Sequence, residues 1–373
     1  MTSKAIITAL TAVLLVSMPV AGQKMKIGSY TFKDGAIYSG ELVSGKPNGK
    51  GRTVFKNGDT YDGEYVKGKR QGYGIYTFTD GERYEGQWFQ DHQHGKGTFY
   101  FRNNNRYEGL WFRDYQHGMG TMYYYNGDTY KGEWEDDMRD GKGTYTYAGG
   151  AYYKGEWQND QKSGQGVFDW NDGSYYDGQW ANNQRNGQGT FKYADGDTYT
   201  GQWKDDIQHG RGIYKFRNGD VYEGDYVQGE RTGEGIFTFA NGDTYVGHFL
   251  NGEQDGEGTF TWKAGATYKG QWRNNNRNGR GTYRWKNGDT YTGDWKDNQM
   301  DGEGILRLSS GEKVKGTFSQ GKKNGKFIEV QKDGSRFEGY YKNGEKDGPF
   351  VERDANGNVT RKGTYKNGRV TQE

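Results

Sequence analysis

The sequence has no cysteine and only 3 prolines among its 373 residues. The lack of cysteine excludes a disulfide framework, a zinc site built from thiolates and a cysteine nucleophile. Aliphatic side chains are also scarce, and the mean hydropathy of −1.19 excludes a protein with several membrane spans. Basic and acidic residues nearly balance, at 51 and 49, so no strong field points to nucleic acid as a partner.

Glycine and aromatic residues are abundant instead. The chain has 65 glycines, and its aromatic residues make up 16% of the sequence, about half of the 31% hydrophobic fraction. Disordered chains of low hydropathy are poor in aromatic residues, and helical bundles are poor in glycine. The composition therefore predicts an ordered chain that is not built from helices.

The first 22 residues differ from the rest. Lys4 provides a positive charge before the apolar segment 5–16, and Val20 and Gly22 are small enough for a signal-peptidase site. This pattern predicts a cleaved signal peptide over residues 1–22, a mature chain from Gln23, and a periplasmic or secreted location. An uncleaved N-terminal anchor is the alternative.

A strict period organises the remaining chain. Aromatic anchor residues, replaced once by valine, recur every 23 residues without an insertion and define fourteen repeats. A half repeat, residues 28–38, precedes the first, and a partial repeat follows the last. We therefore expect a repeat array over residues 23–359 and a partial terminal repeat over 360–373. The anchors are Tyr38, Tyr61, Tyr84, Tyr107, Tyr130, Tyr153, Tyr176, Tyr199, Tyr222, Tyr245, Tyr268, Tyr291, Val314 and Phe337.

Each repeat has the pattern of a β-hairpin. Tyr84, Gly86 and Trp88 alternate with polar residues and so share one face of a strand. The glycine two residues after the anchor leaves a slot for a neighbouring ring. Seven residues after the anchor stands Gly, Asp or Asn in every repeat, which predicts a left-handed turn residue.

Dipeptides such as Asn126-Gly127 recur at the end of the repeat and favour a two-residue type I′ turn. We therefore expect a strand, a loop of six or seven residues, a second strand and a two-residue turn. The predicted fold is all-β: an elongated single-layer antiparallel sheet of about 28 strands. Helix is expected almost nowhere outside residues 5–21.

The repeats resemble a known family. The segments YEGQWFQDHQHGKGTF (84–99), YKGEWEDDMRDGKGTY (130–145) and YTGQWKDDIQHGRGIY (199–214) are similar to MORN repeats, whose pattern is YxGxWxxGxxxGxG. The resemblance covers residues 28–359. It implies a non-catalytic β-hairpin repeat protein that binds membranes or, more often, proteins, including itself. Near the end Phe327 and Phe350 replace the second glycine, and residues 339–359 resemble a shorter variant repeat of some bacterial proteins.

The apparent catalytic and ligand-binding motifs are explained by the repeat. Residues 40–47 match a phosphate-binding loop until Pro47, which replaces the residue that must bind magnesium. His94 and His117 lie in adjacent repeats, roughly 10 Å apart, too far to share a zinc ion without another ligand. We therefore expect no catalytic residues, no metal site, no cofactor and no enzymatic activity.

Two features point to binding. The first is the aromatic face, which is either a thin core or a groove for a peptide, glycan or lipid. The second is the basic end: residues 305–373 contain 15 Lys or Arg and 9 Asp or Glu, a net charge of +6. Three of these lysines, Lys322, Lys323 and Lys326, are candidates for contact with an anionic surface. The candidate aromatic residues are Tyr84, Trp88, Tyr107, Trp111, Tyr130, Trp134, Tyr153, Trp157, Tyr176, Trp180, Tyr199 and Trp203.

The sequence thus favours a non-enzymatic scaffold that presents its repeat surface to a protein partner in the cell envelope or the extracellular space. Two alternatives stay open: a peripheral protein bound to anionic phospholipid, and a glycan-binding protein that uses the aromatic face. The unpaired strand edge at the C-terminal end also predicts a homodimer through the last repeats, unless the lysines there protect that edge.

Overall fold

The computed structural model describes residues 24–372, so the predicted signal peptide lies outside the described residues. The chain divides into an N-terminal part that ends at Ala148 and a C-terminal part that begins at Gly149. The described residues form 31 strands and no helix, and therefore contain no helix that could cross a membrane.

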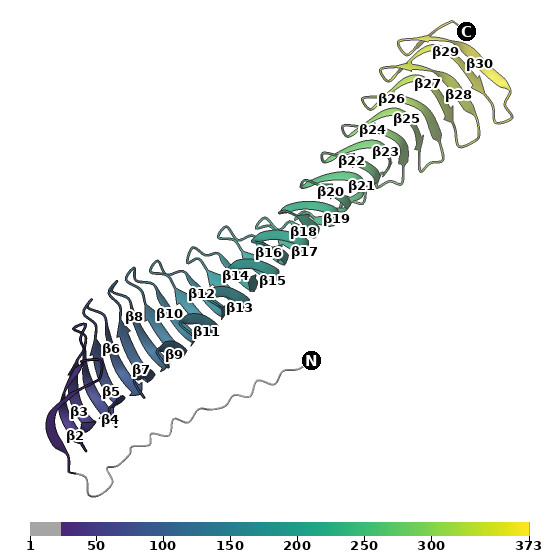
Figure 1. Cartoon of the computed structure of the whole chain (residues 1–373). Helices are drawn as coiled ribbons and strands as arrows, with labels where there is room; N and C mark the ends of the chain where they lie inside the picture. The colour runs from purple at the N-terminus through teal and green to yellow at the C-terminus, as the bar shows by residue number, and fades with distance from the viewer. Residues whose placement is uncertain (1–23, 373) are drawn as a thin grey trace. The chain divides into compact units, whose positions relative to one another are not determined.

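The N-terminal part is a single layer of eleven strands (Figure 1). Each strand pairs antiparallel with the next one in the chain. The strands are β1 (Lys26–Thr31), β2 (Ile37–Val43), β3 (Lys46–Val54), β4 (Thr60–Val66), β5 (Lys69–Thr77), β6 (Arg83–Phe89), β7 (His92–Tyr100), β8 (Arg106–Phe112), β9 (Tyr115–Tyr123), β10 (Thr129–Glu135) and β11 (Met138–Thr146).

The C-terminal part repeats this arrangement with twenty strands, again paired in chain order. The strands are β12 (Tyr152–Gln158), β13 (Gln161–Asp169), β14 (Tyr175–Ala181), β15 (Gln184–Lys192), β16 (Thr198–Lys204), β17 (Ile207–Lys215), β18 (Val221–Val227), β19 (Glu230–Thr238), β20 (Thr244–Leu250), β21 (Glu253–Thr261), β22 (Thr267–Arg273), β23 (Asn276–Arg284), β24 (Thr290–Lys296), β25 (Gln299–Arg307), β26 (Lys313–Ser319), β27 (Lys322–Val330), β28 (Arg336–Lys342), β29 (Glu345–Arg353), β30 (Val359–Lys366) and β31 (Arg369–Gln372).

The predicted all-β hairpin repeat is confirmed. The fourteen repeats account for the 28 strands from β2 to β29, while β1 comes from the leading half repeat. The partial terminal repeat also forms a hairpin, of β30 and β31. Asn367 and Gly368 adopt φ of 48° and 76°, and this tight turn lets the four-residue β31 pair with β30.

The two turns of the repeat are exchanged relative to the prediction. The two-residue turn lies between the strands of one repeat, as at Gln90 and Asp91, whose φ values are 50° and 76°. The prediction of a left-handed residue seven positions after the anchor is therefore confirmed. The loop of six or seven residues that was expected between the two strands of a repeat is not present, because only two residues connect them. Positive φ at two successive residues is the signature of a type I′ turn, whose twist matches that of the strands.

The Asn-Gly dipeptides form a different turn. At Asn126-Gly127 only the glycine has positive φ, at 90°. The N–H of Tyr124 donates to the carbonyl of Asp128, and the N–H of Gly127 donates to the carbonyl of Tyr124, both at 3.0 Å. These bonds enclose a three-residue loop in which glycine supplies the left-handed residue, so the predicted type I′ turn at this dipeptide was wrong.

A bulge makes the second strand of each repeat longer than the first. Gly86 is opposite Gly97, but Trp88 is opposite Gln93, so the second strand contains extra residues between these pairs. Gly95 lies in this stretch with φ of 66°, a conformation that glycine adopts without strain.

The core is a row of tyrosine rings, each lying over two glycines. The Tyr84 side chain is fully buried. A Cβ atom added to Gly86 would come within 2.5 Å of the Tyr84 hydroxyl, and one added to Gly97 would come within 2.5 Å of its ring. The hydroxyl donates to the carbonyl of Gln87 at 2.9 Å. The predicted slot thus accepts the tyrosine ring of the same repeat. We call the sheet surface that carries these rings the ring face, and the opposite surface the polar face.

Near the C-terminus the ring comes from the other strand. Val314 replaces the tyrosine, and Phe327 replaces the second glycine. Phe327 is fully buried, and a Cβ on Gly316 would lie 2.4 Å from its ring. The slot over the sheet is therefore filled in both kinds of repeat.

Candidate functional site

The twelve aromatic residues proposed from sequence lie in the core. Their tyrosines are 0% exposed and their tryptophans 4–6%. The Trp88 ring packs edge-on against Tyr61 and Tyr84 at centroid distances of 5.2 and 5.3 Å, and its Nε1–H donates to the carbonyl of Gly74 at 3.2 Å. These rings form a thin core, and a ligand on this face would meet the residues above them.

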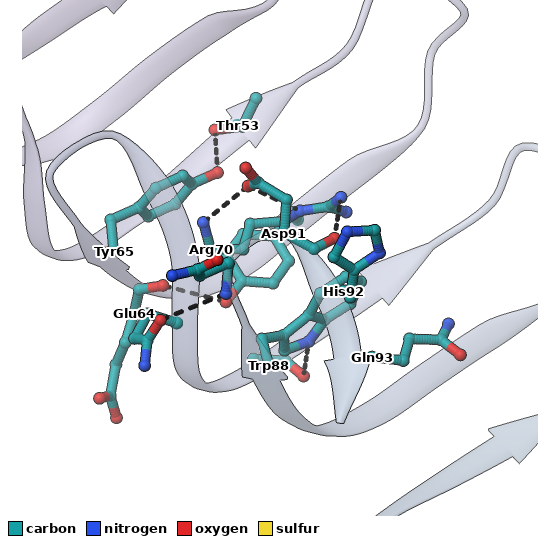
Figure 2. Close-up of polar contacts among 12 residues, drawn as sticks. Thr53, Glu64, Tyr65, Arg70, Trp88, Asp91, His92 and Gln93 are labelled. Atoms are coloured by element: carbon teal, nitrogen blue, oxygen red, sulfur yellow. Dashed lines mark hydrogen bonds and ion pairs between the residues drawn. The ribbon is translucent and has the colours of Figure 1, made fainter. Parts of the chain in front are cut away.

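The upper layer of the ring face combines half-buried rings with cations. The residue nine after the anchor is Arg or Lys in eight repeats and Gln in four. The Arg185 guanidinium lies 4.5 Å from the Trp203 ring centroid, and its Nε–H donates to Asp206 at 2.9 Å. Figure 2 shows the equivalent Arg70, which lies 4.2 Å from the Trp88 ring. Sequence reasoning missed this row, although the restricted choice at that repeat position would have revealed it.

Where glutamine replaces the cation, the shorter side chain ends in an amide. Gln93, Gln116 and Gln254 are 7%, 5% and 8% exposed, and among the described residues nothing forms a hydrogen bond with their side-chain amides. The fourth, Gln208, donates to the hydroxyl of Tyr193 at 3.0 Å.

A hollow of about 380 Å³ opens at Gln254. Its wall contains rings, carboxamides and one guanidinium. The lining residues are Phe239, Gln254, Phe260, Trp262, Trp272, Asn275, Arg277 and Asn298. Burial lowers the pKa of Arg277 from its ordinary value, and the neighbouring Tyr283 and Tyr268 offset part of this decrease.

The polar face has an exposed apolar patch over β6 to β9. Phe89, Leu110, Phe112 and Met119 are 48%, 37%, 39% and 52% exposed. Leu110 and Met119 also line a hollow of about 400 Å³. We call these four residues the apolar patch.

Two histidines continue the patch as a ladder of rings. The centroid distances are 5.6 Å from Phe89 to His94, 5.5 Å from His94 to Phe112, and 5.6 Å from Phe112 to His117. Burial lowers the pKa of His94, and the charges of Arg113 and His92 lower it further, which favours the neutral ring. Within residues 24–372 no group of three or more His, Asp or Glu residues could hold a metal ion.

The three candidate lysines do not share one surface. Lys323 forms an ion pair with Glu329 on the ring face, 4.7 Å from the Tyr341 ring centroid. Lys326 precedes the buried Phe327 in the strand and therefore points to the polar face, where it lines a hollow of about 400 Å³. Lys322 is exposed beside the turn.

These features define a class of protein: an open β-hairpin repeat whose exposed faces, rather than an enclosed pocket, are available for contact. The chain belongs to the MORN-repeat family, because the MORN repeat model matches most of its length in fourteen consecutive segments. The segments are residues 38–60, 61–83, 84–106, 107–129, 130–152, 153–175, 176–198, 199–221, 222–244, 245–267, 268–290, 291–313, 315–336 and 337–359.

No curated protein matches the sequence. Among solved structures, the TCP domain of Drosophila melanogaster SAS-4 (dCPAP), in complex with a proline-rich motif of Ana2, is 13% identical, with 48% of this chain and 90% of that chain covered and a TM-score of 0.28. The TCP10 domain of Danio rerio CPAP is 10% identical, with 78% and 99% covered and a TM-score of 0.14. Virginiamycin B lyase from Staphylococcus aureus is 10% identical, with 83% and 96% covered and a TM-score of 0.13. Scores this low carry no argument about function.

Proposed function

We propose that this protein is an exported, non-enzymatic scaffold that binds a protein partner through the polar face of its N-terminal part. The apolar patch is the observation that carries the proposal. Large apolar side chains exposed side by side are typical of interaction sites, and Phe and Met are enriched at the centre of protein interfaces.

The surroundings of the patch favour a protein over a membrane. Lys96 and Glu108 line the hollow beside Leu110 and Met119, so both signs of charge occur at its rim. A polar rim around an apolar centre is the usual anatomy of a protein interface. A membrane-binding surface would instead surround its apolar residues with Lys and Arg.

The phospholipid alternative has weaker support. Glu329 neutralises Lys323, and the alternation of side chains along β27 separates Lys323 from Lys326. Recognition of anionic lipid typically uses a cluster of several Lys and Arg residues on one surface, and these lysines do not form one. The export of the chain rests on the signal-peptide pattern of residues 1–22, and the absence of catalysis rests on the repeat, which assigns the polar residues to turns and strand pairs.

Affinity capture with matched variants tests the proposal. The mature chain from Gln23 is compared with the double variant Phe89→Ser/Phe112→Ser. The control is Val227→Ser/Leu250→Ser, which removes apolar residues that are 51% and 53% exposed at the same repeat position in the C-terminal part. Quantitative mass spectrometry of the bound proteins is the measurement.

We expect a set of proteins that the wild type and the control retain and the patch variant loses, with equal thermal stability of all three chains. Identical recovery with both double variants would show that the patch is not the interface. Equal binding of all three chains to anionic vesicles, without a retained protein, would favour the lipid alternative.

A further inference from the structure

We propose that the hollow at Gln254 is a binding subsite for a neutral sugar residue of a glycan. It lies on the ring face of the C-terminal part, so it is independent of the protein interface proposed on the other face of the N-terminal part. The repeat itself shows why the hollow exists and what it accepts.

The hollow is the space that a cation fills in the next repeat. Arg277 occupies the position equivalent to Gln254, and its guanidinium lies 4.6 Å from the Trp295 ring and 5.4 Å from the Tyr283 ring. The rings equivalent to these two around Gln254 are Trp272 and Phe260, and both line the hollow. Because the glutamine side chain is shorter than arginine, the volume above these rings is left open.

Gln254 contributes a carboxamide to the wall of the hollow. The residue is 8% exposed, and nothing among residues 24–372 forms a hydrogen bond with its side-chain amide. A carboxamide offers N–H donors and an oxygen acceptor to a ligand.

The remaining wall matches a sugar ring. Trp262 and Phe239 are half-buried and offer flat apolar surfaces, against which the C–H groups of a pyranose can lie. Asn275 accepts the backbone N–H of Gln254 at 2.8 Å through its side-chain oxygen, which leaves the NH₂ group of the same carboxamide to donate to a hydroxyl. Hydroxyl groups both donate and accept, so they also complement the Gln254 amide.

Charge and backbone pairing disfavour two other ligand classes, a cation and a peptide bound as an added strand. The lining residues include no carboxylate, which disfavours a cationic ligand. The guanidinium of Arg277 already donates to the carbonyl of Asn298 at 2.8 Å and is not directed solely at the hollow. A peptide that binds as an added strand needs a free strand edge, but β21 to β24 are paired with their neighbours on both sides.

Calorimetric titration of the mature chain tests the subsite. The probes are cellotetraose, chitotetraose and maltotetraose, together with a polyproline decamer as a peptide probe. Gln254→Arg fills the hollow with the residue that the neighbouring repeats use, so this variant is expected to fold. Gln208→Arg makes the same change where the glutamine amide is already bonded to Tyr193. Trp262→Ala and Trp170→Ala form a second matched pair at one repeat position.

We expect the wild type to bind at least one tetrasaccharide with a Kd below about 1 mM. Gln254→Arg and Trp262→Ala should weaken this binding at least about tenfold, whereas Gln208→Arg and Trp170→Ala should stay within about twofold. The inference fails if no tetrasaccharide binds at about 10 mM or if Gln254→Arg binds as well as the wild type. Binding of the decamer alone, lost in Gln254→Arg, would make the hollow a peptide subsite and overturn the sugar assignment.

Discussion

In the repeat of Val314 and Phe327 the buried ring comes from the second strand, whereas in the tyrosine-anchored repeats it comes from the first. Two substitutions in the middle of the array should move the ring from the first strand to the second. In the repeat anchored at Tyr199, the ring packs edge-on against Trp203 and Tyr226 at 5.1 and 5.2 Å. Phe327 packs against Phe318 and Tyr341 at 5.2 Å each, although it belongs to the opposite strand. The double variant Tyr199→Val/Gly212→Phe should therefore transfer the Val314–Phe327 arrangement.

Each single change should be costly. Tyr199→Val leaves a cavity in a fully buried site and removes the bond from the Tyr199 hydroxyl to the carbonyl of Gln202, a loss of about 2–4 kcal/mol. Gly212→Phe places a Cβ 2.5 Å from the Tyr199 ring, and the two rings cannot both occupy the slot, so the cost is about 3 kcal/mol or more. The double variant should lie only about 1 kcal/mol below the wild type, because only the hydroxyl bond is lost.

The measurement is a double-mutant cycle by urea unfolding, with hydrogen exchange of residues 199–214 because repeat arrays open locally. Gly149→Ala is the control, since a Cβ there would meet no atom within 4 Å. A coupling energy of about 3 kcal/mol or more is expected. Additive effects, or a double variant no more stable than the weaker single variant, would refute the ring exchange.

Four further predictions concern turns, charges and assembly. Asp206→Ala should cost about 1–2 kcal/mol in urea unfolding, because Asp206 accepts the backbone N–H and the Nε–H of Arg185 at 2.9 Å, while Asp206→Asn should be nearly neutral, as Asn298 accepts the same bonds from Arg277. Lys67→Asn should raise the melting temperature, corresponding to up to about 1 kcal/mol, because Lys67 has φ of 52°, which Asn tolerates better; no increase would count against strain at this turn. Burial alone raises the pKa of Asp59, but hydrogen bonds from Tyr76, Asn57 and Thr79 outweigh this effect and hold the pKa below its ordinary value. The ionised Asp59 therefore stabilises the fold above about pH 4, and this stabilisation is lost as the pH falls further. Asp59→Asn should flatten the dependence of the unfolding free energy on pH in that range. Light scattering should show a homodimer for the mature chain and a monomer after truncation at Gly311, and a dimer that survives the truncation would place the contact elsewhere.

The period made most of the fold predictable. Strict spacing of Tyr84, Gly86 and Trp88 gave the strand and its buried face, and the restricted residue seven after the anchor gave the left-handed turn position. The order of the two turns was not predictable from the dipeptides, because Asn-Gly suits both a two-residue turn and a three-residue loop. Only the hydrogen bonds around Gly127 decide between them.

The candidate sites were less predictable, because exposure depends on what lies above a side chain. Periodicity places Trp88 on the same face as Tyr84 but does not show that a cation nine residues after the anchor covers such rings. The hollow at Gln254 depends on the length of one side chain among equivalent positions. The apolar patch combines residues of two adjacent repeats. A sequence analysis that compares only equivalent repeat positions does not detect such a combination.

Successive repeats make equivalent contacts between their aromatic rings, so the number of repeats in the array can change without a change in these contacts. Tyr176 packs against Trp180 of its own repeat and Trp203 of the next, and Tyr199 makes the same two contacts with Trp203 and Tyr226. Removal of residues 199–221 would bring Tyr226 to Tyr176 with the same geometry. Recombination can thus add or delete blocks of 23 residues without a defective junction, whereas a single-residue insertion within a strand reverses every side chain after it in that strand. The length of the array can therefore evolve to fit a partner while the core of each repeat stays unchanged.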